Sequence, residues 1–127
     1  MLSNHRIGAI CYYVNDIDRT EAFYRDVLGL NVQRMDEEGD GWLMASIEGN
    51  VDLIFFKAEC RPGNTPVIVF DLPEGGIDDV IAGLAEKGAT IVTPVSHAPG
   101  GWSGDFSDPD GHVMSFYQSE AVPRSKK

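Results

Sequence analysis

Apolar residues recur at helical spacing in two separate stretches of the chain. From Asp16 to Gly29 they lie three and four residues apart, with charged residues on the other side, which predicts an amphipathic helix packed on an apolar surface. Asp16 is suited to cap the free amides of the first turn, and Gly29 is suited to end the helix. A weaker second stretch stops at Gly88. The predicted apolar stripes are Thr20, Phe23, Tyr24, Val27 and Leu28 in the first helix, and Ile77, Val80, Ile81 and Leu84 in the second.

Short runs rich in β-branched and aromatic residues predict the strands. Residues 42–47 and 51–56 should form a hairpin around Glu48, Gly49 and Asn50, after an acidic turn at residues 36–41. Residues 95–105 (VSHAPGGWSGD) are small and turn-forming apart from one tryptophan, so we predict a loop of the kind in which function concentrates. Asp108 and Asp110 should cap the turn before the last strand. The predicted strands are residues 7–14, 31–35, 42–47, 51–56, 66–72 and 89–94, a short one near Phe106, and residues 112–118.

The order of these elements repeats once along the chain. Gly29 and Gly88, and likewise Trp42 and Trp102, are about 60 residues apart, which indicates a duplicated module and not a longer array. We therefore predict one α+β domain over residues 1–127, with a first module at about 7–56, a linker at 57–65, a second module at about 66–118 and a disordered tail at 119–127.

Composition narrows the range of partners. The 127 residues include 20 acidic and 10 basic side chains, a formal net charge of −10, so nucleic acid is excluded as an expected partner and cations are favoured. The N-terminus does not have the pattern of a secretory leader, and the apolar runs are far shorter than the ~18 to 20 residues of a membrane span, so we expect a cytoplasmic protein. In that compartment Cys11 and Cys60 are expected to be thiols.

Two segments carry a resemblance to a known family. VNDIDRTEAFYRDVLGL (residues 14–30) and DPDGHVMSFY (residues 108–117), in this order and at this spacing, are similar to the vicinal oxygen chelate superfamily, which includes glyoxalases, bleomycin-resistance proteins and extradiol dioxygenases. The resemblance covers about Ile7 to Gln118. It implies two tandem βαβββ modules whose curled mixed sheets form a cleft, and it implies a homodimer.

The resemblance also identifies the positions at which the metalloenzymes of the family hold a divalent ion. These positions fall on Ala9, on Ile54 (or Asp52 if the register slips by two), on Val67 or Ile68, and on Ser115. Because a divalent ion needs several imidazole or carboxylate donors, and this set offers at most Asp52, we expect no metal cofactor. His5, His97 and His112 lie outside these positions, and solvated or capping roles are expected for them.

The cleft implied by the family would be lined by alternate residues of the strands. Such an apolar and aromatic list with few polar anchors is typical of a small-molecule pocket, although it equally describes a hydrophobic core. Trp42 and Trp102 each follow a glycine and are predicted to be lids that contact the ligand; the alternative is that they cover the core. The predicted ligand-binding residues are Tyr13, Trp42, Asp52, Ile54, Phe56, His97, Trp102, Ser115 and Tyr117; Ala9, Cys11, Val67, Val69 and Val113 complete the inner face.

Three hypotheses for function remain open from the sequence. The first is a metal-free binding protein that sequesters a planar or cationic organic molecule, as the bleomycin-resistance branch does in antibiotic resistance. The second is a metal-dependent glyoxalase-like lyase, isomerase or dioxygenase that uses shifted ligands such as Asp52, His97 and His112. The third is a structural or regulatory pocket without catalysis. We favour the first.

Overall fold

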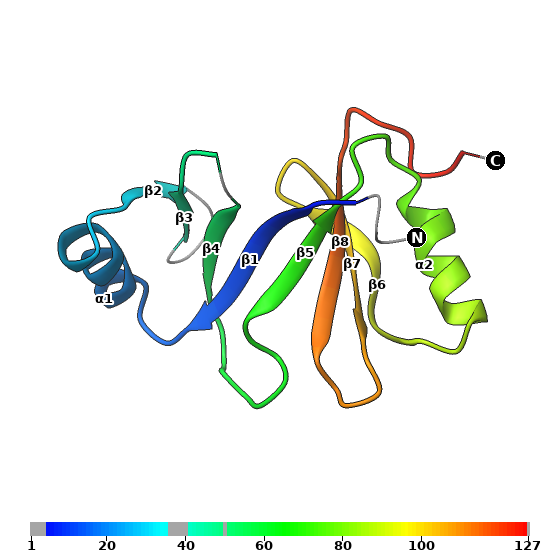
Figure 1. The fold of residues 1–127 in the computed structure, drawn as a ribbon, viewed down its shortest axis with the longest axis horizontal. Coiled ribbons are helices and arrows are strands. Elements are labelled where there is room, and N and C mark those ends of the chain that lie inside the picture. The colour runs from blue at the N-terminus through cyan, green and yellow to red at the C-terminus, as the bar shows by residue number, and fades with distance from the viewer. Residues whose placement is uncertain (1–4, 36–40, 50, 127) are drawn as a thin grey trace. The chain divides into compact units, whose positions relative to one another are not determined.

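The computed structural model describes residues 5–35, 41–49 and 51–126. Most of the predicted acidic turn (36–40), together with Asn50 and Lys127, lies outside the described residues. The chain divides into two compact units: residues 8–66 form the first unit, and residues 67–126 together with 5–7 form the second unit (Figure 1). Within the described ranges, no helix is long and apolar enough to span a membrane.

The first unit has the element order β-α-β-β-β. β1 (Ile7–Val14) is followed by α1 (Ile17–Ala22), by a π-helical turn η2 (Phe23–Val27), and then by β2 (Asn31–Met35), β3 (Trp42–Ser46) and β4 (Asp52–Lys57). The strand order is β2-β3-β4-β1, in which β1 runs parallel to β4 and the other pairs are antiparallel. The predicted hairpin of residues 42–47 and 51–56 is confirmed as the β3–β4 pair.

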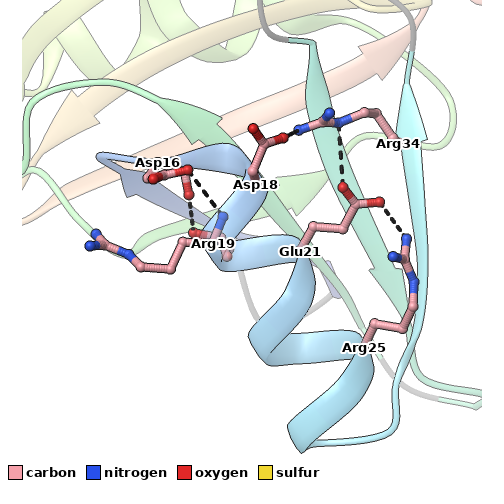
Figure 2. A network of polar contacts seen from close by, with 7 residues as sticks. Asp16, Asp18, Arg19, Glu21, Arg25 and Arg34 are labelled. Atoms are coloured by element: carbon pink, nitrogen blue, oxygen red, sulfur yellow. Dashed lines mark hydrogen bonds and ion pairs between the residues drawn. The ribbon is translucent and has the colours of Figure 1, made fainter.

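Asp16 begins the first helix in the way its sequence position predicts. Its carboxylate accepts a hydrogen bond from the Arg19 amide at 3.0 Å, which satisfies one of the free donors of the first turn (Figure 2). On the charged side of the helix, Arg34 of β2 reaches Asp18 at 2.7 Å and Glu21 at 3.6 Å, and Arg25 also pairs with Glu21. Exposed pairs contribute little energy singly, but this network joins the helix to β2.

The apolar stripe of this helix is only partly buried, which corrects the prediction. Tyr24 packs on Phe55 with ring centroids 4.5 Å apart, but Phe23, Val27 and Leu28 are 47%, 68% and 51% exposed. The helix widens into a π turn, closed by the Leu28 amide on the Phe23 carbonyl at 3.1 Å, so residues three and four apart no longer share one line. The core of the unit consists of Ile17, Val32, Leu43, Ala45 and Phe55.

The second unit repeats the same topology. β5 (Val67–Asp71), α2 (Ile77–Glu86), β6 (Thr90–Ala98), β7 (Gly101–Ser107) and β8 (Val113–Ser119) form the strand order β5-β8-β7-β6, with β5 parallel to β8. The predicted apolar stripe of α2 packs into the core, so the α+β fold of two βαβββ modules is confirmed. That core consists of Leu72, Ile77, Ile81, Phe106 and Phe116, with Val80 and Leu84 against it.

The predicted loop at residues 95–105 is wrong, because these residues form a β-hairpin. β6 continues to Ala98, and β7 begins after a turn at Pro99 and Gly100. Gly101 is needed inside β7, because a Cβ there would lie 1.9 Å from the Gln118 carbonyl oxygen, whereas a Cβ on Gly104 would be in tight contact with the Ile81 side chain at 3.1 Å. A glycine within a strand often marks such a close approach of a neighbouring segment.

The C-terminal residues also differ from the expectation of a disordered tail. α2 begins after Gly76 without a side-chain cap of its own, and Gln118 of β8 and the tail supply acceptors instead. The Pro123 carbonyl accepts a hydrogen bond from the Gly76 amide at 2.8 Å, and the Arg124 carbonyl accepts one from the Asp78 amide at 2.9 Å. The Arg124 guanidinium also donates to the Asp78 carboxylate at 3.0 Å. The tail is thus held by the free donors that every helix N-terminus presents.

Candidate functional site

The sheet of the first unit has one face on the helix and core and a second face that we call the inner face of the first unit. Successive side chains of a strand alternate between faces, and paired residues share a face. Leu43, Ala45 and Phe55 belong to the helix side. The register therefore assigns to the inner face Ala9, Cys11 and Tyr13 of β1, Asp52, Ile54 and Phe56 of β4, Trp42 and Met44 of β3, and Asn31, Gln33 and Met35 of β2.

Three aromatic residues form a row across this face, which we call the aromatic row: Tyr13, Phe56 and Trp42. Phe56 is the register partner of both of its neighbours, and its ring stacks on the Trp42 indole at 5.6 Å with an interplanar angle of 30°. Tyr13 is half-buried, and its backbone amide donates to the Thr65 hydroxyl at 3.0 Å. Trp42 is only 7% exposed. Its indole Nε1–H is buried and has no hydrogen-bond partner among the described residues.

Polar groups on this face are sparse. Asp52, half-buried, is the register partner of Ala9, at the far end of β4 from Phe56. Cys11 pairs with Ile54 between them, and neither Cys11 nor Cys60 is in a disulfide. The described strands of this face are therefore mainly apolar and aromatic, with one carboxylate and with the exposed Asn31 and Gln33 on the edge strand β2, a composition suited to an organic ligand.

The inner face of the second unit, opposite α2, is more polar. It carries Val67 and Val69 of β5, Val113, Ser115 and Tyr117 of β8, and Ser103 and Asp105 of β7. Ser115 is 5% exposed, and its hydroxyl donates to the Gly104 carbonyl at 3.2 Å.

Tyr117 is held on this inner face by its phenol. The hydroxyl donates to the Pro99 carbonyl at 2.7 Å. Partial burial, followed by the charges of Glu120 and Asp71, raises the pKa of Tyr117 above its usual value. The phenol is therefore a neutral donor at ordinary pH.

Trp102 and His97 lie on the other face of this sheet, so the structure does not group them with Ser115 and Tyr117. Trp102 is the register partner of both His97 and the buried Gln118, and it packs against the core cluster of the second unit. The His97 ring meets it edge-on at 5.4 Å, and the Arg124 guanidinium lies 4.2 Å from its ring centroid. The environment of Trp102 is that of a lid over the core.

The two tryptophans differ because the repeat is offset by one residue. Trp42 is the first residue of β3 and Trp102 the second of β7, the equivalent strand of the second unit. A shift of one residue moves a side chain to the other face of a sheet. The two tryptophans are therefore not at equivalent positions: Trp42 lies on the inner face of its sheet, and Trp102 lies on the core side of its sheet.

The residues at the family's metal positions do not fit a divalent ion. Ala9, Ile54, Val67 and Ser115 occupy the inner faces, and only Asp52 among the alternatives is a carboxylate. Within the described part of the chain, no three His, Cys, Asp or Glu side chains come together as a metal site. The shifted ligands do not group either, because His97 is on the α2 side of its sheet and His112 lies exposed in the turn before β8. There the Asp108 carboxylate accepts from the His112 amide, which confirms Asp108 as the cap of that turn.

Sequence reasoning missed several residues that the faces now include, among them Gln33 and Met35 of β2. Met44 follows Trp42 by two positions in β3, and period two alone was sufficient to find it. Ser103 and Asp105 were assigned to a loop, where no face can be predicted.

Comparisons with known proteins agree with this architecture. The family model described as Glyoxalase/Bleomycin resistance protein/Dioxygenase superfamily matches residues 6–116. The sequence has no significant match among curated proteins.

Several solved structures share the fold at low sequence identity. Streptomyces coelicolor methylmalonyl-CoA epimerase in complex with 2-nitronate-propionyl-CoA is 20% identical with a TM-score of 0.69, over 92% of this chain and 96% of the other. A hypothetical protein from Bacillus halodurans C-125 is 18% identical with a TM-score of 0.68, over 92% and 96%. A superfamily member from Vibrio splendidus 12B01 is 19% identical with a TM-score of 0.62, over 91% and 100%. At these identities the likeness establishes the fold alone.

Proposed function

The chain belongs to the Glyoxalase/Bleomycin resistance protein/Dioxygenase superfamily, and we propose that it is a metal-free binding protein that sequesters a flat organic molecule, neutral or cationic, on the inner face of the first unit. The observation that supports this most strongly is the aromatic row of Tyr13, Phe56 and Trp42. Neighbouring register positions bring these rings onto one face, next to the apolar Ile54 and Met44.

A preference for flat molecules follows from the chemistry of the row. Aromatic rings bind other rings by offset or edge contacts worth about 0.5–1.5 kcal/mol each beyond the burial of their area. A cation over such a ring gains about 0.5–2 kcal/mol, depending on desolvation. The net charge of −10 raises the local concentration of cations, and Asp52 is a carboxylate on the same face.

Binding without a metal follows from the donor set. A divalent ion would have to be held by aliphatic residues, one serine and at most Asp52 at the family positions, and these supply one carboxylate and no imidazole. Elemental analysis of the purified protein should therefore find no stoichiometric zinc, nickel, manganese or iron. About one ion per chain would refute the metal-free part of the proposal.

The test of the site is a titration of the wild type and of Phe56→Leu with bleomycin and with the flat cation N-methylacridinium, followed by tryptophan fluorescence. Phe56→Leu removes the central ring and keeps an apolar side chain, so at least one of these probes should bind the variant about tenfold more weakly. Phe23→Leu is the matched control, because Phe23 is an exposed aromatic outside the inner face. Saturable binding that Phe56→Leu leaves unchanged, or no binding of either probe to the wild type, would contradict the proposal.

A further inference from the structure

We infer that the Trp42 indole N–H is the hydrogen-bond donor of the site, and that the ligand is a flat ring system carrying an acceptor, such as a carbonyl oxygen, at its edge. This inference rests on the proposed function and adds a chemical class to it. Stacking on the aromatic row would accept any flat molecule, whereas a donor selects for a particular atom on its rim.

The starting point is an unsatisfied group. Trp42 is 7% exposed, and its Nε1–H has no partner among the described residues. Buried donors in native proteins are nearly always paired, because an unpaired one costs the whole free energy of its desolvation. An indole has one N–H and accepts nothing, so only an acceptor atom can satisfy it.

None of the described neighbours of Trp42 on the inner face supplies this acceptor, including Met35, its register partner in β2, and Gln33, two residues before Met35. The Phe56 ring is stacked at 30° to the indole, so its face runs nearly parallel to the indole plane, and the N–H lies in that plane. Asp52 is on the same face but four residues from Phe56 along β4, roughly 13 Å at the rise of a strand. Among the described residues of the inner face, the Asp52 carboxylate is therefore out of reach.

The position of the donor determines where the acceptor must be. An in-plane N–H meets its partner at the edge of the indole, and the aromatic row continues from Trp42 to Phe56 and Tyr13. A ring system that packs along this row presents its rim to the indole edge. An acceptor atom on that rim pairs with the Trp42 N–H and removes its desolvation penalty, whereas a C–H at the same place leaves the N–H unpaired.

The experiment compares 9-fluorenone with fluorene, two flat tricyclic molecules that differ in a carbonyl against a methylene. Fluorenone should bind the wild type about tenfold more tightly, since a buried donor gains its partner. In a ¹H–¹⁵N spectrum, the Trp42 Nε1–H signal should move downfield with fluorenone and not with fluorene. Trp42→Phe keeps a ring and removes the donor, so it should bind both molecules equally; Trp102→Phe should retain the preference.

Each outcome decides the inference. Equal affinity of the wild type for the two probes, or a fluorenone preference that survives in Trp42→Phe, overturns it. If N-methylacridinium binds and is weakened by Phe56→Leu while neither tricycle binds, the acceptor inference falls and the proposed function stands. If none of the probes binds the wild type, both fall. Circular dichroism of Trp42→Phe checks that the variant is folded, and an unfolded variant leaves the spectrum of the wild type to decide alone.

Discussion

Replacing Gln118 by leucine should destabilise the second unit, because this side chain joins α2, β8 and the C-terminal tail. Gln118 is 1% exposed. Its Oε1 accepts from the Ile77 amide at 2.9 Å, and its Nε2 donates to the Val122 carbonyl at 2.9 Å. Leucine keeps a similar volume but removes both functions. The Ile77 amide, at the first turn of α2, then loses its acceptor inside the core.

The magnitude follows from that amide. A buried donor left without a partner costs about 1–3 kcal/mol, whereas the carbonyl of the half-buried Val122 is able to turn to water. For a chain of this length the melting temperature should fall by roughly 3–10 °C. Thermal unfolding followed by circular dichroism measures this, and hydrogen exchange at the Ile77 amide should become faster. Gln33→Leu, at an exposed position in β2, is the matched control and should stay within about 0.5 kcal/mol of the wild type. A Gln118→Leu protein as stable as that control would refute the role assigned to this residue.

Changes at Trp102, at two glycines and at two tyrosines should have distinct effects on stability and binding. Trp102→Ala should lower stability by about 2–4 kcal/mol and leave the affinity for N-methylacridinium unchanged, since the side chain packs on the core; weaker binding with unchanged melting would contradict this. Gly101→Ala should fail to fold or melt far lower, because its Cβ would meet the Gln118 carbonyl at 1.9 Å, whereas Gly111→Ala, with nothing within 4 Å, should lose only the cost of its positive φ. Burial, followed by the charge of Tyr12, raises the pKa of Tyr24, and burial is also the main cause of the raised pKa of Tyr117. The folded protein therefore keeps these phenol protons above pH ~10, where the unfolded chain releases them. The free energy of unfolding should decline as the pH rises beyond that value, and the decline should be less steep in Tyr117→Phe. Light scattering should give a dimer mass, as the family resemblance predicts, and a monomer at micromolar concentration would count against it.

Much of the fold could be predicted because local signals and the apolar pattern agree. Asp16 has the residue type of a cap, and its carboxylate acts as one. The strands at residues 7–14 and 31–35 have the bounds that were predicted, since β-branched and aromatic residues fill them and turns flank them. The internal repeat then predicted the second unit, whose helix stripe is buried as expected.

The errors share a physical cause, which is that local composition does not report tertiary contacts. Gly101 and Gly104 have the composition of a loop, yet at Gly101 the backbone of β8 passes too close for a side chain, and at Gly104 a Cβ would be in tight contact with Ile81. The tail beyond residue 119 has no apolar pattern, and it is held there by tertiary contacts: the free amides of α2, the Asp78 carboxylate and the Gln118 side chain. The exposed Val27 follows from a π turn that periodicity of 3.6 does not predict.

The candidate site was predicted unevenly for the same reason. Tyr13, Asp52, Ile54 and Phe56 were assigned to one face by period two, and the register confirms that they share it. Trp102 was placed by analogy with its repeat partner. A single residue of offset between the repeats puts it on the other face of its sheet.

The two indole N–H groups report directly on whether a flat ligand lies on the inner face of the first unit. Trp42 belongs to that face, and Trp102 to the core-facing side of the second unit. In a ¹H–¹⁵N titration with N-methylacridinium, we predict that the Trp42 Nε1–H signal shifts saturably while the Trp102 signal stays in place. A saturable shift of Trp102 alone, or no shift of either signal at millimolar ligand, would contradict the account.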